Sequence, residues 1–139
     1  MSEENRSSIA GLSHDIALLT GRCLLGAVML IAGFNAYQDM SDNIAWYGRL
    51  GIPVPQFTAP FAAAFQAMTG LALIVGIKTR LVALLVGAFW ALAAIVGHSA
   101  LLSVNDRNVF LLEMAVIAGC FAFYAAGAGR YSIDGRDRQ

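Results

Sequence analysis

Four polar residues in otherwise apolar stretches are the best candidates for chemistry in this sequence. Glu113, His98, Gln66 and Asn35 each stand inside or at the end of a long apolar run. An ionisable side chain costs about 2.5–3.5 kcal/mol at the centre of a membrane helix, so it needs a specific role. Glu113 can accept or donate a proton, and the imidazole of His98 titrates near neutral pH. The structural alternatives are a Glu113 carboxyl that holds helices together and a His98 ring that caps its helix.

Other residue patterns exclude several kinds of active site. Cys23 and Cys120 form no Cys-x-x-Cys motif. We interpret them as small apolar fillers, with a redox-active pair as the alternative. The sequence has no Gly-rich phosphate loop, no Ser-His-Asp set and no cluster of metal ligands. We therefore expect no metal site and no autonomous enzyme, although a role as one subunit of a larger enzyme stays open.

The composition indicates a small integral membrane protein. The chain has 139 residues, of which 58% are hydrophobic and 13% charged. An ordinary soluble domain carries about 25% charged residues, roughly twice as many. A soluble globular enzyme and a disordered linker are therefore excluded. Nine basic residues balance nine acidic ones, so no basic surface exists to bind nucleic acid. The expected surroundings are a lipid bilayer.

Four apolar runs are long enough to cross that bilayer. They cover residues 16–37, 57–77, 81–98 and 109–126, and a hydrocarbon core of about 30 Å needs about 20 helical residues. Backbone polar groups in lipid must be satisfied within a segment, so the runs are helices. The sequence predicts an all-α protein: an antiparallel, up-down bundle of four transmembrane helices over residues 16–128. Residues 1–15 form a polar segment before it, and residues 129–139 form a tail.

The basic residues predict how the bundle is oriented. Six of them would lie on the side of the termini, and Arg49 and Arg107 on the other; the six are Arg6, Lys78, Arg80, Arg130, Arg136 and Arg138. Lys and Arg are enriched in cytoplasmic loops. We therefore expect both termini in the cytoplasm and a bacterial-type inner membrane. By helical rise, the four polar candidates then fall in the outer half of the bilayer and form one pocket.

Small residues share a helical face with the most polar residue of three expected spans. Because lipid offers helices no hydrophobic reason to associate, close approach at small residues is what packs them. The inward faces predicted in this way carry Arg22, Gly26 and Gly33; Gln66 and Gly70; and Gly87 with His98. Arg22 either extends its guanidinium to the headgroups or makes a buried ion pair or anion contact.

In its order of motifs the chain resembles the DoxX family of small four-helix membrane proteins. The resemblance runs from about Arg22 to Gly135, on the segments 22–26, 50–55, 70–76, 79–81 and 129–134. Three positions depart from the family pattern. Gln66 stands where a Glu is usual, Leu112-Glu113 replaces a common Lys-Asn pair, and Ala128 replaces a proline.

The resemblance implies a fold more directly than an activity. Some members resemble membrane subunits of thiosulfate:quinone oxidoreductases, and others are implicated in redox-stress complexes or in the assembly of membrane proteins. We expect a membrane subunit of a quinone-linked redox complex, with a quinone headgroup in the pocket. The expected partner is another membrane subunit, a peripheral redox subunit or a second copy. The alternatives are a scaffold or assembly factor without chemistry, and a small-molecule carrier.

Overall fold

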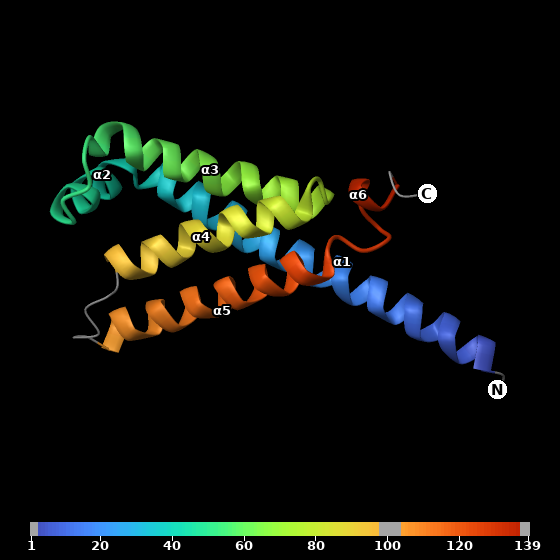
Figure 1. Ribbon diagram of the computed structural model, residues 1–139. Helices are drawn as coiled ribbons and strands as arrows, with labels where there is room; N and C mark the ends of the chain where they lie inside the picture. The colour runs from blue at the N-terminus through green and yellow to red at the C-terminus, as the bar shows by residue number, and fades with distance from the viewer. Residues whose placement is uncertain (1–2, 98–103, 137–139) are drawn as a thin grey trace.

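A computed structural model describes residues 3–97 and 104–136 of the chain, and these residues form helices without any strand. Figure 1 shows four long helices in a bundle, with a short helix at each end. The helices are α1 (Glu3–Gln38), α2 (Met40–Arg49), α3 (Pro55–Val75), α4 (Thr79–Gly97), α5 (Val104–Ala126) and α6 (Ile133–Arg136). The predicted all-α, four-helix architecture is confirmed.

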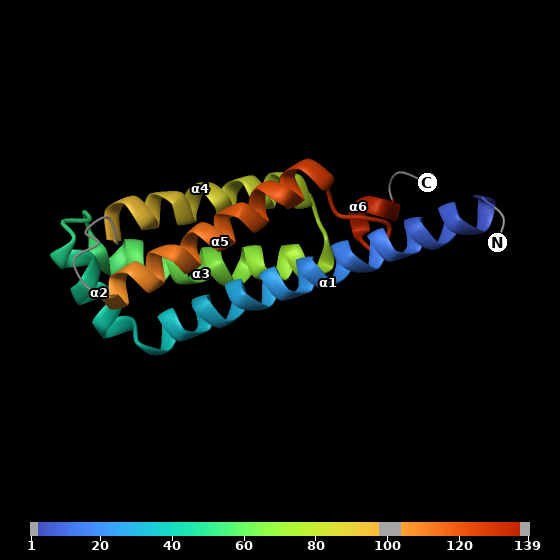
Figure 2. The ribbon, with the colours of Figure 1, turned by 90° about the horizontal axis from the view of Figure 1, so that it is seen from below.

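The four long helices alternate in direction, as an up-down bundle requires. The start of α1 and the whole of α6 lie at the same end of the bundle, and α2 lies at the opposite end (Figures 1 and 2). α1 extends well beyond the other helices at the end that holds the termini. Both termini are therefore on one side, and which side faces the cytoplasm stays a prediction from the basic residues.

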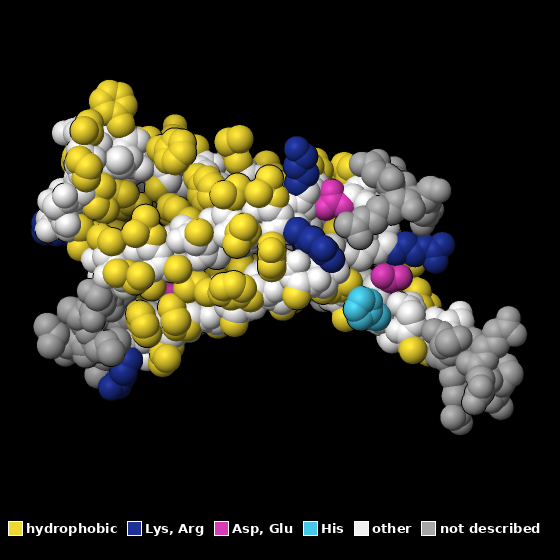
Figure 3. All heavy atoms as spheres, viewed as in Figure 1, with side chains coloured by type: hydrophobic (Ala, Val, Ile, Leu, Met, Phe, Trp, Pro, Cys, Tyr) yellow, Lys and Arg dark blue, Asp and Glu magenta, His cyan; other side chains and the backbone are white. Residues whose placement is uncertain are grey.

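The surface of the bundle is suited to lipid. Four helical segments are long and apolar enough to cross a membrane: Ser8–Gln38, Pro55–Val75, Thr79–Gly97 and Arg107–Ala126. In each segment, at most 39% of the most apolar 18-residue stretch is buried inside the protein. Large apolar side chains therefore point outward. Figure 3 shows hydrophobic side chains along the length of the bundle and most charged side chains near its two ends.

Glycine brings α1 and α3 into backbone contact. A Cβ atom on Gly70 would stand 2.7 Å from the carbonyl oxygen of Gly26, and one on Gly26 would stand 2.7 Å from the carbonyl oxygen of Gly70. Seven residues further along α1, a Cβ on Gly33 would stand 2.7 Å from the carbonyl oxygen of Ala63. No other residue type fits at these distances. The predicted packing faces of α1 and α3 therefore meet each other.

The second close pair is α4 with α5. A Cβ on Gly87 would lie 3.3 Å from the Cβ of Cys120, so the two helices pack closely at these residues. The buried core connects the two pairs, through Met29 of α1, Leu73 of α3, Val86 of α4 and Cys120 of α5. Contacts between the pairs are much sparser than contacts within them. Space for a cavity therefore lies between the pairs.

Residues 38–56, expected to be a connection, contain the helix α2. Its start is tied to α1, because Asn43 Nδ2 donates a hydrogen bond to the carbonyl oxygen of Ala36 at 2.8 Å. Its Trp46 ring reaches the end of α4, where a Cβ on Gly97 would stand 2.8 Å from the ring. α2 therefore folds back across the end of the bundle, from the α1/α3 pair to the α4/α5 pair.

Arg22 fastens the other end of the bundle. Its side chain is 1% exposed and donates hydrogen bonds to the carbonyl oxygens of Ala128 (2.7 Å) and Tyr131 (2.6 Å). Its guanidinium is thus buried against backbone carbonyls. The segment that it holds places Asp134 at the start of α4, where the carboxylate accepts hydrogen bonds from the backbone N–H groups of Lys78 and Thr79.

Candidate functional site

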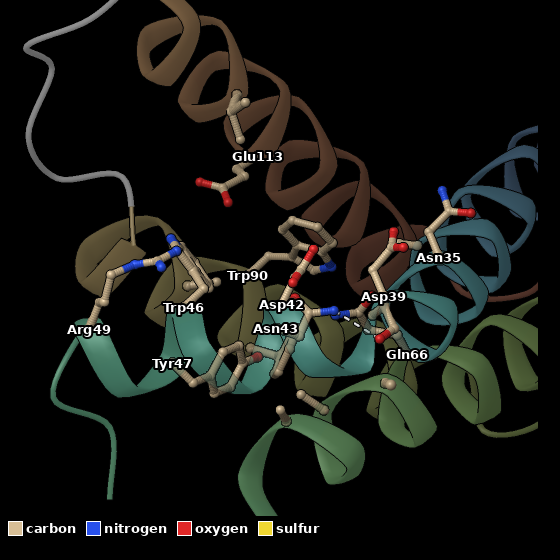
Figure 4. Close-up of a pocket in the computed structure, with 18 residues that line it drawn as sticks. Asn35, Asp39, Asp42, Asn43, Trp46, Tyr47, Arg49, Gln66, Trp90 and Glu113 are labelled. Carbon is tan, nitrogen blue, oxygen red and sulfur yellow. Dashed lines mark hydrogen bonds between the residues drawn. The ribbon is translucent and has the colours of Figure 1, made fainter. Parts of the chain in front are cut away.

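A cavity of about 510 Å³ lies between the two helix pairs, next to α2. Helices α1 to α5 all contribute to its wall, and Figure 4 shows the side chains that line it. The lining residues are Ala32, Asn35, Ala36 and Asp39 at the end of α1 and just beyond it; Asp42, Asn43, Trp46, Tyr47 and Arg49 of α2; Ala59, Ala62, Ala63 and Gln66 of α3; Phe89, Trp90 and Ala93 of α4; and Val109 and Glu113 of α5.

Three of the four residues proposed from the sequence line this cavity. Asn35 comes from α1 and is exposed, Gln66 comes from α3 and is half-buried, and Glu113 comes from α5 and is 2% exposed. In Figure 4 the Glu113 carboxylate extends from α5 into the space in front of Trp90 and α2. The fourth residue, His98, lies outside the described residues.

The local sequence explains why Glu113 faces inward. Val109 and Glu113 are four residues apart, which is one helical turn, and both line the cavity. Cys120, seven residues after Glu113, is 1% exposed and belongs to the core. The face of α5 that packs against α4 near Cys120 therefore becomes part of the cavity wall near Glu113, where the two helix pairs lie further apart.

The Trp90 ring is fixed at the floor of the cavity. Its Nε1–H lies 3.2 Å from Sδ of Met29, which is a core residue of α1. The neighbouring Phe89 ring meets Trp90 edge-to-face, with 6.1 Å between ring centroids, and packs on Phe65 of α3 at 5.1 Å. The aromatic floor is thus held by both helix pairs.

The sequence analysis missed the contribution of α2. Asp39, Asp42, Asn43 and Trp46 all line the cavity. They stand at i, i+3, i+4 and i+7, which is one face of a helix. That spacing was the available signal for a helix here, but hydropathy alone gives a short polar segment no reason to fold back onto the bundle.

Comparison with known proteins fixes the family. The model of the DoxX family matches residues 17–99, which include Asn35, Gln66 and all of α2. The chain belongs to the DoxX family.

Relatives of this DoxX protein carry the names of membrane proteins. It is 27% identical over 121 residues to "Inner membrane protein YqjF" of Escherichia coli, which covers 87% of the chain and 92% of the relative. It is 24% identical to "Inner membrane protein YphA" of the same organism, over 91% of the chain and 94% of the relative. A match of 30% identity to "Putative oxidoreductase CatD" of Bacillus subtilis covers 52% and 53%. No solved structure matches. With its four spans, the protein is a multi-pass inner membrane protein.

Charge and burial set the chemistry of the DoxX cavity. Three carboxylates line it, from Asp39, Asp42 and Glu113, against the one guanidinium of Arg49. Burial raises the pKa of the Tyr47 phenol, so its hydroxyl stays protonated at neutral pH and can donate a hydrogen bond. Tyr47 also meets Trp46 edge-to-face at 5.6 Å.

Metal and thiol chemistry find little support among the described residues. Within 3–97 and 104–136, no three His, Cys, Asp or Glu side chains are grouped so that they could hold a metal ion. Cys120 is buried in the core and Cys23 is half-buried, both as free thiols. The cavity therefore offers carboxylates, amides, a phenol and indole rings as its reactive and binding groups.

Proposed function

We propose that this DoxX protein is a membrane subunit of a redox complex, and that its cavity next to α2 binds a quinone headgroup. A quinone presents two carbonyl oxygens on a flat ring. The amides of Asn35 and Gln66 can donate hydrogen bonds to carbonyl oxygens. Glu113 would exchange a proton with the ring oxygen on reduction or oxidation, and the Trp90 ring offers a flat apolar surface.

The observation that carries this proposal is the convergence of Asn35, Gln66 and Glu113 on one cavity from three helices. Ligand sites are typically concave, largely apolar and furnished with a few converging polar groups. The name of the CatD relative, which contains the word oxidoreductase, adds weaker support. With the termini in the cytoplasm, the cavity would lie toward the outer face of the membrane.

The test is quinone-dependent activity in membranes that carry the native complex. Glu113→Gln and His98→Ala should each lower this activity at least about tenfold, while the amount of inserted protein stays the same. Asp15→Asn, at the opposite end of the bundle, is the matched control and should leave the activity unchanged. Full activity in both the Glu113→Gln and the His98→Ala variant would refute the quinone site.

A scaffold or assembly factor is the second candidate. The observation in its favour is the extension of α1 beyond the bundle, which exposes Ile9, Leu12 and Ile16 at about half of their surface. Mild-detergent purification followed by mass spectrometry would identify the partner. If a complex co-purifies and its activity tolerates Glu113→Gln and Gln66→Leu, the scaffold role is favoured over the quinone site.

A further inference from the structure

The walls of the cavity combine aromatic rings with an excess of negative charge. Trp46 and Tyr47 of α2 and Phe89 and Trp90 of α4 supply rings on two sides. Glu113 adds a carboxylate that is 2% exposed, within reach of the same space. Figure 4 shows Trp90, Asp42 and Glu113 facing one another across it.

A neutral quinone ring would gain little binding energy from the negative charge of these carboxylates. The faces of Trp, Tyr and Phe rings carry negative electrostatic potential and attract cations. Carboxylates in a partly desolvated cavity attract a cation more strongly than they would in water. Among the described residues that line the cavity, Arg49 is the one basic side chain that opposes this potential, and it is exposed.

We propose that this cavity binds lipophilic organic cations, namely quaternary ammonium ions or protonated amines that carry an aromatic ring. The cationic head would lie between the indole rings and the carboxylates of Asp42, Asp39 and Glu113. The apolar ring of the ligand would lie against Phe89 and the alanines of α3. This inference goes beyond the quinone proposal and does not depend on it.

The chain reports on this cavity by itself. It has two tryptophans, Trp46 and Trp90, and both line the cavity. Intrinsic tryptophan fluorescence in lipid nanodiscs therefore measures occupancy without a label. The probe is phenyltrimethylammonium, and its matched control is tert-butylbenzene, which has the same shape without the charge. We expect saturable quenching by the cation with an affinity at least about tenfold higher than that of the neutral compound.

Variants of α2 separate electrostatics from folding. Asp42 is exposed and Asp39 is exposed, so their replacement leaves the buried core intact. Asp42→Asn and Asp39→Asn should each weaken binding of phenyltrimethylammonium about threefold, and the double variant about tenfold. Arg49→Gln should change the affinity in the opposite direction, tightening it about twofold to threefold. Asp15→Asn, remote from the cavity, should leave the affinity unchanged.

Three results would overturn the inference. These are the absence of saturable quenching, equal affinity for the charged and neutral probes, and an affinity that ignores the variants of Asp39, Asp42 and Arg49. A quinone titration in the same nanodiscs keeps this failure distinct from that of the proposed function. Quenching by quinone without quenching by the cation would refute the cation site and leave the quinone site in place.

Discussion

Replacement of Arg22 by methionine should release the C-terminal segment from the bundle. The guanidinium is buried and donates two hydrogen bonds, at 2.7 and 2.6 Å, to the carbonyl oxygens of Ala128 and Tyr131. Met keeps most of the apolar volume of the side chain but cannot donate. Both carbonyl groups would then lose a hydrogen-bond donor that lies more than 100 residues away in the sequence.

The magnitude follows from those two bonds. A hydrogen bond that involves a charged group contributes about 1.5–3 kcal/mol, so the pair contributes about 3–6 kcal/mol before any compensation. Removing the guanidinium also removes the cost of its desolvation, which lowers the net effect. We expect Arg22→Met to reduce the free energy of unfolding by about 2–4 kcal/mol, measured by denaturation in mixed micelles.

Limited proteolysis reports the local effect. Arg130 lies inside the held segment and is exposed, so trypsin should cleave after it much faster in Arg22→Met. The matched control is Arg80→Met, because the Arg80 guanidinium is exposed and makes one longer bond, 3.3 Å, to the carbonyl oxygen of Ala125. It should change stability by less than about 1 kcal/mol. Equal stability and equal cleavage in Arg22→Met and in the wild type would refute this account.

Three further predictions address other contacts. Gly70→Ala should destabilise the α1/α3 pair by about 2 kcal/mol or more, because its Cβ would stand 2.7 Å from the Gly26 carbonyl oxygen. The control in the same micelle assay is Gly119→Ala, whose Cβ would meet only side-chain atoms at 4.0 Å. This control should be neutral or slightly stabilising. Asp134→Ala should cost about 0.5–2 kcal/mol by removing the cap of α4, with Asp134→Asn intermediate in the same measurement. Burial raises the pKa of Tyr47 in the folded state above its unfolded value near 10. The contribution of Tyr47 to stability is therefore present below pH 10 and is lost as pH rises through the folded pKa. Phenolate absorbance should show that one tyrosine titrates at this higher pH, and Tyr47→Phe should remove that step.

The number, direction and packing faces of the long helices could be predicted from the sequence. Hydropathy over about 20 residues suffices to find a span, because lipid forces every backbone group into a helix. The faces followed from small residues, and Gly26 and Gly70 do meet across α1 and α3. These features depend on side-chain size and polarity, which the sequence states directly.

The partners of Arg22 could not be predicted in the same way. They are backbone carbonyls of Ala128 and Tyr131, and a carbonyl has no signature in residue type. Asp134 also interacts electrostatically with Arg22, and its carboxylate accepts hydrogen bonds from the backbone N–H groups of Lys78 and Thr79. Only the path of the chain after α5 brings the carbonyls to Arg22.

The half of the candidate site that the long helices supply could be predicted from the sequence, and the half that α2 supplies could not. Depth along a helix follows from rise per residue, so Asn35, Gln66 and Glu113 could be assigned to one level of the membrane, and they line one cavity. The α2 half of the wall depends on a short polar helix folding back onto the bundle. Its position is set by the Trp46 contact with Gly97 and the Asn43 bond to Ala36, neither of which residue type or hydropathy predicts.

The two ends of the bundle explain why the cavity lies where it does. At the end that holds the termini, Arg22 connects α1 to the segment after α5, and Asp134 connects that segment to the start of α4. These bonds tie the α1/α3 pair to the α4/α5 pair at this end. At the opposite end the pairs are bridged by α2, whose Trp46 and Asn43 span the gap from outside. At the end next to α2, polar side chains can therefore come together between the helix pairs without disrupting the buried core. A ligand there would meet a wall that combines the four long helices of the bundle with α2.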